Sequence, residues 1–420
     1  MSDFLPLCRS LADRARLGAT FLAGTYTAVK NAWLLTLADS LLHQQAAILE
    51  ANARDLALAP QYKLSPAELD RLRLTPQRLA QAAEGLRQVA ALPDPVGELR
   101  EGSVRPNGLE VRKIGVPLGV ILFLYESRPN VTLDAAALCV KSGNAVILRG
   151  GKEALHSNMA LYSLIAQTLQ SSGLPTDVVQ FVDRPEREIV GQLLQMNDRI
   201  DLVIPRGGES LIRRVTAEAT MPVMKHSKGL CHVYVHKAAD RAMAQRVVLN
   251  AKCQRPGVCN AAECLLVDAA IAEAFLPEIA TALLTRGVEL RGCPITCRLV
   301  PQAKPATTDD YHTEYLDFIL SVRVVADLDQ ALEHIRRHGS GHTEAILTSD
   351  LAVARRFTQE VDSAAVLVNA STRFHDGYEL GLGAEIGIST DRLHARGPCG
   401  LRELTTYKYV VYGEGQIRGE

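Results

Sequence analysis

Apolar positions near the N-terminus recur with the spacing of an α-helix. Five of them stand three or four residues apart, or side by side, with polar residues between them: Leu34, Leu37, Leu41, Leu42 and Ala46. This period puts them on one helix face, so we predict two helices over residues 4–58. Residues 52–62 are predicted to be a connection. A further helix is expected to begin with Ser65 as N-cap and Pro66 in its first turn, and to continue to about Leu92.

Beyond residue 100 the pattern changes to short apolar runs that alternate with helical segments. Asn107-Gly108 predicts a hairpin turn between two short strands. The first alternating series predicts strands over 119–125, 145–148, 178–182 and 200–204, and helices over 131–142, 157–171, 186–196 and 209–220. The second series predicts strands over 231–235, 264–267, 318–325, 344–347 and 365–369, and helices over 241–250, 270–286, 328–338 and 351–361. Nearly continuous apolar strands between helices predict parallel sheets that are covered on both faces.

Two C-terminal segments depart from this alternation. Residues 371–400 are rich in glycine, with basic and hydroxyl residues interspersed, which favours an irregular loop around an anionic ligand. A linker that supports the tail is the alternative. Residues 404–412 read LTTYKYVVY, a composition that favours a strand. We expect this strand to pair with another element, in this chain or in a partner subunit.

Composition narrows the class of protein. The chain has 420 residues, of which 47% are apolar and 22% charged, so we expect a globular protein of two or three domains. A net charge of −1 argues against binding to nucleic acid or to an anionic membrane. The nine cysteines form no disulfide framework, which predicts reduced thiols and a cytoplasmic protein. Residues 1–19 do not read as a signal peptide, and no run is long enough to span a bilayer. Cys293 and Cys297 lack a second ligand pair nearby, so no metal site is expected.

The stretch with the strongest chemical signal is residues 250–263, NAKCQRPGVCNAAE. Pro256-Gly257 predicts a rigid turn immediately before Cys259, and small residues follow. A cysteine at the mouth of such a turn, near a helix N-terminus, would have a lowered pKa and could act as a nucleophile. The alternative, a buried and inert cysteine, remains open at this point.

Two loops at strand ends are candidate anion sites. Gly207-Gly208 lies between a strand and a helix, where backbone N–H groups and the helix dipole favour a phosphate. Arg149-Gly150-Gly151-Lys152 forms a second loop with two cations, which suits a phosphomonoester beside a ribose. Plain turns are the alternative for each, but together on neighbouring strands they favour a nucleotide. His226 and His394 are candidate general bases, or structural histidines.

Five motifs follow one another along the chain: YESRPNVT (125–132), SGNAVILRGG (142–151), IPRGG (204–208), KxQRPGVCNA (252–261) and EIGISTDRLHARGP (385–398). Together, and in family order, they resemble the gamma-glutamyl phosphate reductase family of the aldehyde dehydrogenase superfamily. The resemblance covers nearly the whole chain. It implies an α/β, aldehyde dehydrogenase-like fold with two parallel-sheet Rossmann-type domains and a small β oligomerisation arm. The implied NADP(H)-binding domain spans 1–100 and 116–227, the catalytic cysteine domain 228–375, and the arm with the C-terminal loop 101–115 and 376–420.

The resemblance also implies an activity. It is the NADPH-dependent reduction of L-glutamyl 5-phosphate to L-glutamate 5-semialdehyde with release of phosphate, the second step of proline synthesis from glutamate. Cys259 would be the nucleophile that forms a thioester, with backbone N–H groups at Cys259 and Asn260 as candidates for the oxyanion hole. The implied protein is a homo-oligomer, and association with glutamate 5-kinase is left open.

Individual positions carry further expectations from the same resemblance. Arg149 would contact the adenosine ribose, and Lys152 would favour NADPH over NADH. Gly207 and Gly208 would lie at the cofactor pyrophosphate, and Glu314 would hold the nicotinamide ribose. Arg128, Arg255 and Arg396 are candidates for binding the phosphate and carboxylate of the substrate.

One departure from the superfamily is informative. Hydrolytic members have a general-base glutamate where this chain reads KHSKG over residues 225–229, with no acid. This loss suits an enzyme whose thioester must not be hydrolysed, and the role of His226 stays open. The side chain of the oxyanion hole is not assigned. Competing readings are another acylating aldehyde dehydrogenase, such as a CoA-dependent one, a thiol hydrolase or transferase without nicotinamide, and an inactive binding protein.

Overall fold

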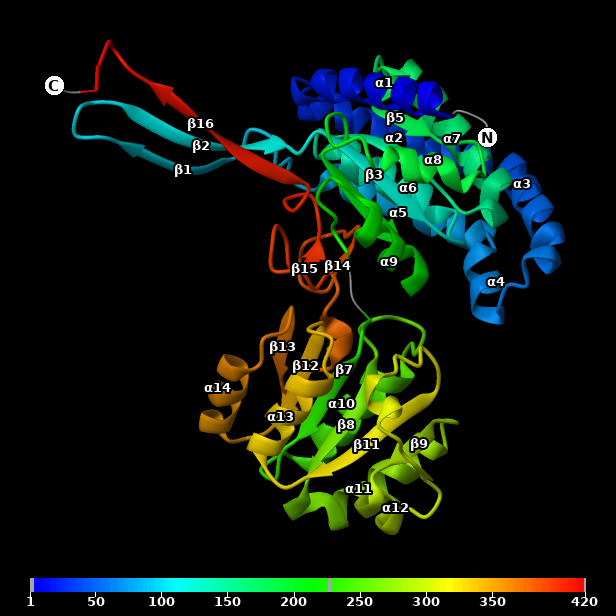
Figure 1. Cartoon of the computed structure of the whole chain (residues 1–420), viewed down its shortest axis with the longest axis vertical. Helices are drawn as coiled ribbons and strands as arrows, with labels where there is room; N and C mark the ends of the chain where they lie inside the picture. The colour runs from blue at the N-terminus through cyan, green and yellow to red at the C-terminus, as the bar shows by residue number, and fades with distance from the viewer. Residues whose placement is uncertain (1–3, 226–227, 419–420) are drawn as a thin grey trace. The chain divides into compact units, whose positions relative to one another are not determined.

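The structure is a computed structural model that describes residues 4–225 and 228–418 (Figure 1). The chain divides into two compact units. The first comprises residues 1–225, 382–387 and 399–420, and the second comprises residues 226–381 and 388–398. The division into three parts that the resemblance implies, with a separate β arm, stays a prediction.

Helices precede the first strand in the first unit. They are α1 (Leu5–Ala23), α2 (Thr27–His43), α3 (Gln45–Leu58), α4 (Pro66–Leu72) and α5 (Pro76–Ala91). The prediction of two helices over residues 4–58 is wrong, because three form there. Much of the predicted connection over 52–62 belongs to α3. The polar side chains of this part of α3 can be buried in a helix because each has a hydrogen-bond partner. Asn52 donates to the carbonyl of Leu72 at 2.8 Å, and Asp55 accepts from the N–H of Ser157 at 2.7 Å.

The helix predicted from Ser65 to about Leu92 is in fact α4 and α5. Ser65 does cap α4, and it exchanges hydrogen bonds with Glu68 in a capping box. The chain leaves the helix at Arg73, and the Thr75 side chain caps α5 ahead of Pro76. Because proline lacks an N–H and disfavours helical geometry in the residue before it, Pro76 begins a new helix and does not continue the old one.

Four parallel strands form the main sheet of the first unit, in the order β5-β4-β3-β6. They are β3 (Val120–Tyr125), β4 (Ala145–Arg149), β5 (Val179–Phe181) and β6 (Leu202–Arg206), with helices α6 (Asn130–Lys141), α7 (Leu155–Ser171), α8 (Arg187–Leu193) and α9 (Glu209–Glu218). All six residues of β3 are buried, as expected for a strand covered on both faces. The predicted parallel sheet is confirmed. However, β4 and β6 are not neighbours, because β3 lies between them.

A three-stranded antiparallel sheet also belongs to the first unit. It contains β1 (Leu99–Val104), β2 (Glu110–Pro117) and β16 (Thr405–Tyr412), in the order β1-β2-β16 (Figure 1). The predicted hairpin turn is confirmed, and Gly108 adopts a φ of +86°, which glycine tolerates. The tail strand pairs with β2 of the same chain along its whole length.

Seven parallel strands form the sheet of the second unit, in the order β10-β9-β11-β8-β7-β12-β13. They are β7 (Cys231–Val235), β8 (Ala262–Asp268), β9 (Glu289–Gly292), β10 (Lys304–Pro305), β11 (Ile319–Val325), β12 (Thr343–Leu347) and β13 (Ala365–Val368). The helices are α10 (Arg241–Cys253), α11 (Ala269–Leu284), α12 (Pro294–Leu299), α13 (Leu328–His338) and α14 (Leu351–Glu360). Val233 and Leu265 pack with α10 and α11, whereas Tyr234 and Cys264 pack with α13. Helices therefore cover both faces, as predicted.

Some elements were not predicted. β9, α12 and β10 lie in residues 289–305, where the segments are too short to show a period. Within 371–400, predicted to be irregular, β14 (Gly387–Ser389) and β15 (Gly397–Cys399) form a two-stranded sheet. Among the helices that the structure describes, none has the length and apolar character needed to cross a membrane.

Candidate active site

Cys259 lies in the turn that joins α10 to β8. Ala261 donates to the carbonyl of Val258 at 3.1 Å, which closes the turn. The element that follows is a strand, so the expectation of a helix N-terminus beside Cys259 is wrong. Cys259 is half-buried, whereas Cys231 is fully buried. A nucleophilic thiol must be reachable by substrate, and partial exposure meets that requirement.

The backbone of Cys259 is enclosed by residues at the start of β7. A Cβ atom on Gly229 would lie 1.8 Å from the Cys259 carbonyl oxygen, so only glycine fits there. The Cys231 thiol donates to the same oxygen at 3.1 Å. Burial raises the pKa of Cys231 well above its ordinary value, so this thiol stays protonated. Cys231 is therefore a fixed hydrogen-bond donor, and Cys259 is the candidate nucleophile of the two.

Asn260 is buried directly after the cysteine. Its side-chain amide donates to the carbonyl of His375 at 3.0 Å and to that of Arg373 at 3.4 Å. The side chain thus ties the Cys259 turn to the segment after β13. The expected oxyanion-hole role concerns the backbone N–H groups, and it stays a prediction.

Arg373 is a cation near the candidate nucleophile that was not among the predicted site residues. It is half-buried, and its Nε donates to Gln254 at 2.8 Å. Burial lowers the pKa of Arg373, and the thiol of Cys259 is close enough to act on it electrostatically in the opposite direction. The basic residues of segment 371–400 indicated that a cation of this segment could bind an anionic ligand. The sequence did not distinguish Arg373 from the other arginines of the segment.

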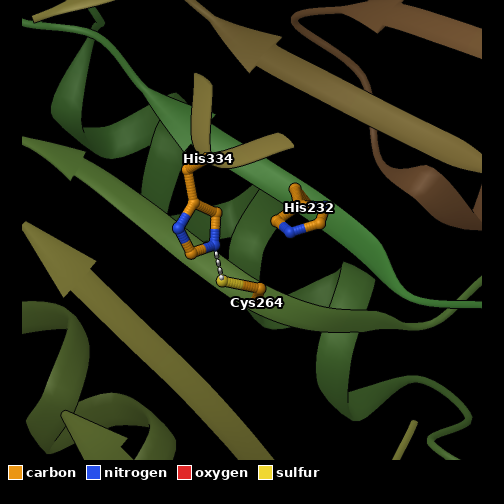
Figure 2. Close-up of side chains that lie close together, drawn as sticks. All are labelled: His232, Cys264 and His334. Carbon is orange, nitrogen blue, oxygen red and sulfur yellow. Dashed lines mark hydrogen bonds between the residues drawn. The ribbon is translucent and has the colours of Figure 1, made fainter. Parts of the chain in front are cut away.

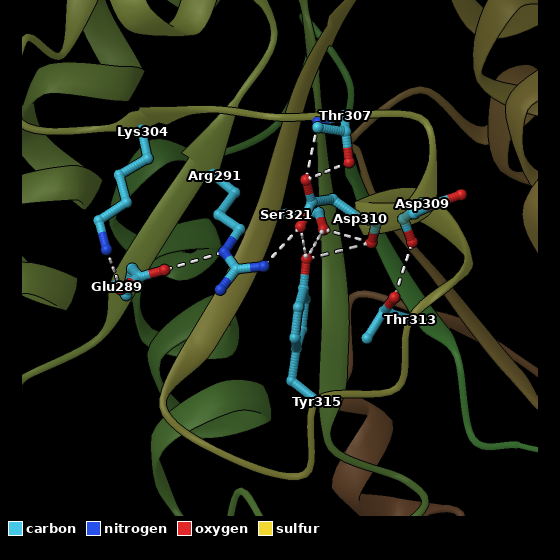
Figure 3. Close-up of polar contacts among 9 residues, drawn as sticks. All are labelled: Glu289, Arg291, Lys304, Thr307, Asp309, Asp310, Thr313, Tyr315 and Ser321. Carbon is cyan, nitrogen blue, oxygen red and sulfur yellow. Dashed lines mark hydrogen bonds and ion pairs between the residues drawn. The ribbon is translucent and has the colours of Figure 1, made fainter.

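Glu314 lies in the second unit, as Cys259 does, and its Oε1 accepts a hydrogen bond from the N–H of Gly229 at 2.9 Å. Figure 3 shows how the neighbouring loop is held by Asp310. This carboxylate contacts Arg291 at 2.7 Å, the N–H of Thr307 at 2.7 Å and the hydroxyl of Tyr315 at 2.8 Å. Burial opposes ionisation, but these donors outweigh it and hold the pKa of Asp310 well below its usual range.

A buried ion pair supports the other side of this loop. Lys252 at the end of α10 contacts Glu263 in β8 at 2.7 Å, and neither side chain is more than 1% exposed. Glu263 also accepts from the N–H of Leu316 at 3.2 Å. Burial raises the pKa of Glu263 to about 7, although Lys252 opposes this. The pair thus links both flanks of the Cys259 turn to the loop that carries Glu314.

In the first unit, the two predicted cations lie at and just beyond the end of β4. Arg149 donates to the carbonyl of Pro185 at 3.0 Å, and burial lowers its pKa. Its Nε is buried without a hydrogen-bond partner among residues 4–225 and 228–418. Lys152 is exposed, with its Nζ 5.2 Å from the centre of the Tyr62 ring. An unsatisfied buried donor beside an exposed cation suits an anionic ligand.

A carboxylate already occupies the predicted anion position at the start of α9. The N–H of Gly208 donates to Glu126 Oε2 at 2.8 Å. A Cβ atom on Gly207 would lie 2.5 Å from the same oxygen. Glu126 follows β3, so the inner strand next to β6 supplies this group. A cofactor phosphate at Gly208 would have to displace Glu126, and the pyrophosphate role of Gly207 and Gly208 stays a prediction.

The three arginines that were predicted to bind the substrate lie in different surroundings. Arg128 is half-buried in the first unit, in the turn before α6. Arg255 is exposed in the Cys259 turn. Arg396 is bound to Asp362 through an ion pair of 2.6 Å and a 3.0 Å bond to its carbonyl. His226 lies outside the described residues.

We expect His375, whose carbonyl accepts a hydrogen bond from the Asn260 side chain, to make the stability of the second unit sensitive to acid. Its Nδ1 is 2.7 Å from the hydroxyl of Thr343, and burial lowers its pKa to about 4. Because the unfolded chain binds the proton more tightly, this contribution to stability is complete above pH 6.5 and is lost as the pH falls through 4. We expect the free energy of unfolding to fall by about 2–3 kcal/mol between pH 7 and 4.5 through this group.

The measurement is denaturant unfolding at both pH values, for the wild-type protein and for His375→Gln. The variant should lose that part of the pH dependence. An equal loss of stability in both proteins would assign the acid sensitivity to other groups.

Comparisons with known proteins agree with this geometry. The model of the aldehyde dehydrogenase family matches residues 30–293. Gamma-glutamyl phosphate reductase of Carboxydothermus hydrogenoformans is 56% identical over 98% of this chain and 99% of its own length. The crystal structure of gamma-glutamyl phosphate reductase from Thermotoga maritima superimposes with a TM-score of 0.96, at 45% identity, over 98% of this chain and 100% of that one.

More distant structures share the fold alone. A propionaldehyde dehydrogenase from Rhodopseudomonas palustris, solved with bound CoA, has a TM-score of 0.70 at 14% identity, with 96% of each chain covered. The family assignment therefore rests on the relatives above, which match this chain over nearly its whole length. The chain belongs to the aldehyde dehydrogenase family and, within it, to the gamma-glutamyl phosphate reductases.

Proposed function

We propose that this chain reduces L-glutamyl 5-phosphate to L-glutamate 5-semialdehyde with NADPH and releases phosphate, as the second step of proline synthesis from glutamate. The observation that carries the proposal is a half-buried Cys259 in a turn enclosed by Gly229, in a chain 56% identical to a gamma-glutamyl phosphate reductase. We also propose that the protein is cytoplasmic, because thiols stay reduced in the cytoplasm.

Cys259 performs the covalent step. Its thiolate attacks the acyl carbon, the C–O bond to phosphate breaks, and a thioester forms. Backbone N–H groups at Cys259 and Asn260 stabilise the developing oxyanion. A nicotinamide cofactor, when bound, would supply the hydride that reduces the thioester carbon. Cys259 holds the reduced carbon as a thiohemiacetal, which collapses to the aldehyde and releases the Cys259 thiolate. The segment 225–229 offers no carboxylate to activate water, which protects the thioester from hydrolysis.

Cations of the second unit are the groups that we propose to bind the anionic parts of the substrate. Arg373 lies within electrostatic reach of Cys259 and of Arg255, so the two guanidinium groups share one region of the unit. We propose that they bind the phosphoryl group as it leaves, because guanidinium groups bind phosphate oxygens in pairs. Arg396 is bound to Asp362, and a role in holding the substrate carboxylate would require that pair to open.

For the cofactor, Arg149 and Lys152 are the residues that suit a phosphorylated ribose. Exposed Lys152 is free of any ion pair in the part of the chain that the structure describes, so its charge is available to the 2′-phosphate. We expect Lys152→Glu to lower the ratio of kcat/KM for NADPH to that for NADH by roughly tenfold to a hundredfold, because a carboxylate repels the phosphate.

Steady-state kinetics with both cofactors measures this ratio. Lys237→Glu, which makes the same charge change at an exposed site two residues after β7, is the matched control and should leave the ratio unchanged. An unchanged ratio in Lys152→Glu would remove this lysine from the cofactor site.

We propose that the protein is a homo-oligomer and that the three-stranded sheet serves its assembly. Several large apolar side chains of β16 are exposed there: Tyr407, Tyr409, Val411 and Tyr412. The strand also has an edge that faces no other strand among the described residues, and exposed edges favour pairing. Light scattering of the wild-type protein and of Tyr409→Asp tests this, since the variant should have a lower molar mass in solution than the wild-type oligomer.

Association with glutamate 5-kinase is a separate possibility, which co-purification of the two proteins tests.

The reaction is tested in reverse, by phosphate-dependent reduction of NADP+ with glutamate semialdehyde, followed by absorbance. The proposal requires a signal that depends on inorganic phosphate. A signal that requires CoA would identify another acylating aldehyde dehydrogenase. The absence of any signal, with a folded protein, would favour the hydrolase or binding-protein alternatives.

A further inference from the structure

Two histidines and a cysteine converge in the interior of the second unit. His232 comes from β7, Cys264 from β8 and His334 from α13, and all three are buried. Figure 2 shows the ring of His334 directed at the Cys264 sulfur, with His232 beside them. One ligand atom from each residue lies within 4.8 Å of the other two, and the sulfur is 3.6 Å from His334 Nε2. Sulfur and nitrogen ligands of one tetrahedral zinc ion stand roughly 3.5 Å apart, given Zn–S and Zn–N bonds of about 2.3 and 2.0 Å.

His232 is oriented as a metal ligand would be. Its Nδ1 contacts Glu344 Oε2 at 2.8 Å, and its backbone N–H donates to the same oxygen at 2.9 Å. A carboxylate on the far ring nitrogen is the usual second contact of a metal-bound histidine. The other nitrogen, Nε2, is fully buried and has no hydrogen-bond partner within residues 4–225 and 228–418. A bond to a metal would satisfy this atom.

We propose that His232 Nε2, Cys264 Sγ and His334 Nε2 form a binding site for one Zn²⁺ ion. Imidazole and thiolate are the ligands that this ion takes in structural sites. The site would join β7, β8 and α13, and β8 begins three residues after Cys259. It is independent of the substrate and cofactor proposed above.

The metal-free state carries protons that the ion must displace. Arg323 donates to His334 Nδ1 at 2.9 Å, and because arginine only donates, the His334 proton resides on Nε2. An ion that binds to His334 Nε2 would displace this proton. His334 Nδ1 would then have to carry the proton, so the half-buried Arg323 would have to withdraw from it.

A line of imidazoles leads from the surface to this cluster. His312 is exposed, and its Nε2 is 3.0 Å from His338 Nδ1. The ring of His338 lies 4.5 Å from that of His334. Successive imidazoles offer transient ligands, so they provide the entry path that a buried metal site needs.

Zinc binding is measured on the full chain with Cys259→Ala as background, so that the half-buried thiol does not contribute. After removal of metal by a chelator and dialysis, Zn²⁺ is titrated in competition with a chromophoric chelator. We expect one ion per chain, binding at least a hundredfold weaker after Cys264→Ala, and about tenfold tighter after Arg323→Met. Co²⁺ in place of Zn²⁺ should give thiolate-to-metal charge-transfer absorption that Cys264→Ala removes.

Two controls make the result decisive. Cys293→Ala should change neither the stoichiometry nor the cobalt spectrum, because Cys293 and Cys297 supply no part of this site. Circular dichroism checks that Cys264→Ala is folded, and His334→Gln tests a second ligand if it is not. No bound zinc in the background protein, or binding that survives Cys264→Ala and His334→Gln, would overturn the proposal. Loss of binding in Cys293→Ala would overturn it as well.

Discussion

Replacing Cys259 with alanine is expected to lower turnover by roughly ten-thousand-fold or more, because no other group in the chemistry proposed can form the thioester. The side chain is half-buried in a turn, so its loss leaves no large cavity. The fold, and the affinity for NADPH, should be unchanged. Turnover is followed as phosphate-dependent NADP+ reduction, and cofactor affinity by the fluorescence of bound NADPH.

Cys253→Ala is the matched control for this experiment. Cys253 is also half-buried and ends α10, six residues before Cys259. It packs at the margin of the core between α10, α11 and the sheet, so its truncation changes stability slightly and chemistry not at all. Substantial turnover in Cys259→Ala would remove this cysteine from its role, whereas equal losses in both variants would point to a general effect on the fold.

Gly229→Ala is expected to have the next largest effect. The added methyl would lie 1.8 Å from the Cys259 carbonyl oxygen and 2.6 Å from its Cα, and both are backbone atoms that cannot rotate away. Cys259 must therefore shift. The N–H of Gly229, which donates to Glu314 at 2.9 Å, would move with it. We expect turnover to fall about a hundredfold, since a displacement near 1 Å can cost that much, and stability to fall by about 1–3 kcal/mol.

Kinetics and denaturant unfolding separate these two effects. Gly85→Ala in α5 is the control, because a Cβ atom there meets nothing within 4 Å. That variant should retain wild-type turnover and gain up to about 1 kcal/mol in stability, since alanine favours a helix over glycine. Wild-type turnover in Gly229→Ala would contradict the tight enclosure of the Cys259 turn.

Local sequence patterns predicted the secondary structure of the alternating regions well. The strand at 231–235 and the helix at 328–338 begin and end where predicted. The hairpin at Asn107-Gly108 and the capping role of Ser65 are also confirmed. These features depend on residues within a few positions of one another, so the information is local. One error arose at 45–58, where polar residues such as Asn52 are buried in a helix because partners distant in sequence satisfy them.

The sequence by itself determined that apolar strands alternate with helices in two parallel sheets, and that a cysteine follows a Pro-Gly turn. It could not determine which strands are neighbours, because strand order follows from packing across the whole sheet. Only the tertiary structure brought Glu126 to the N–H of Gly208, Gly229 to the backbone of Cys259, and His232 and His334 to Cys264. The physical reason is that helix and turn preferences act between near neighbours, whereas close packing and buried polar contacts join residues that lie tens of positions apart.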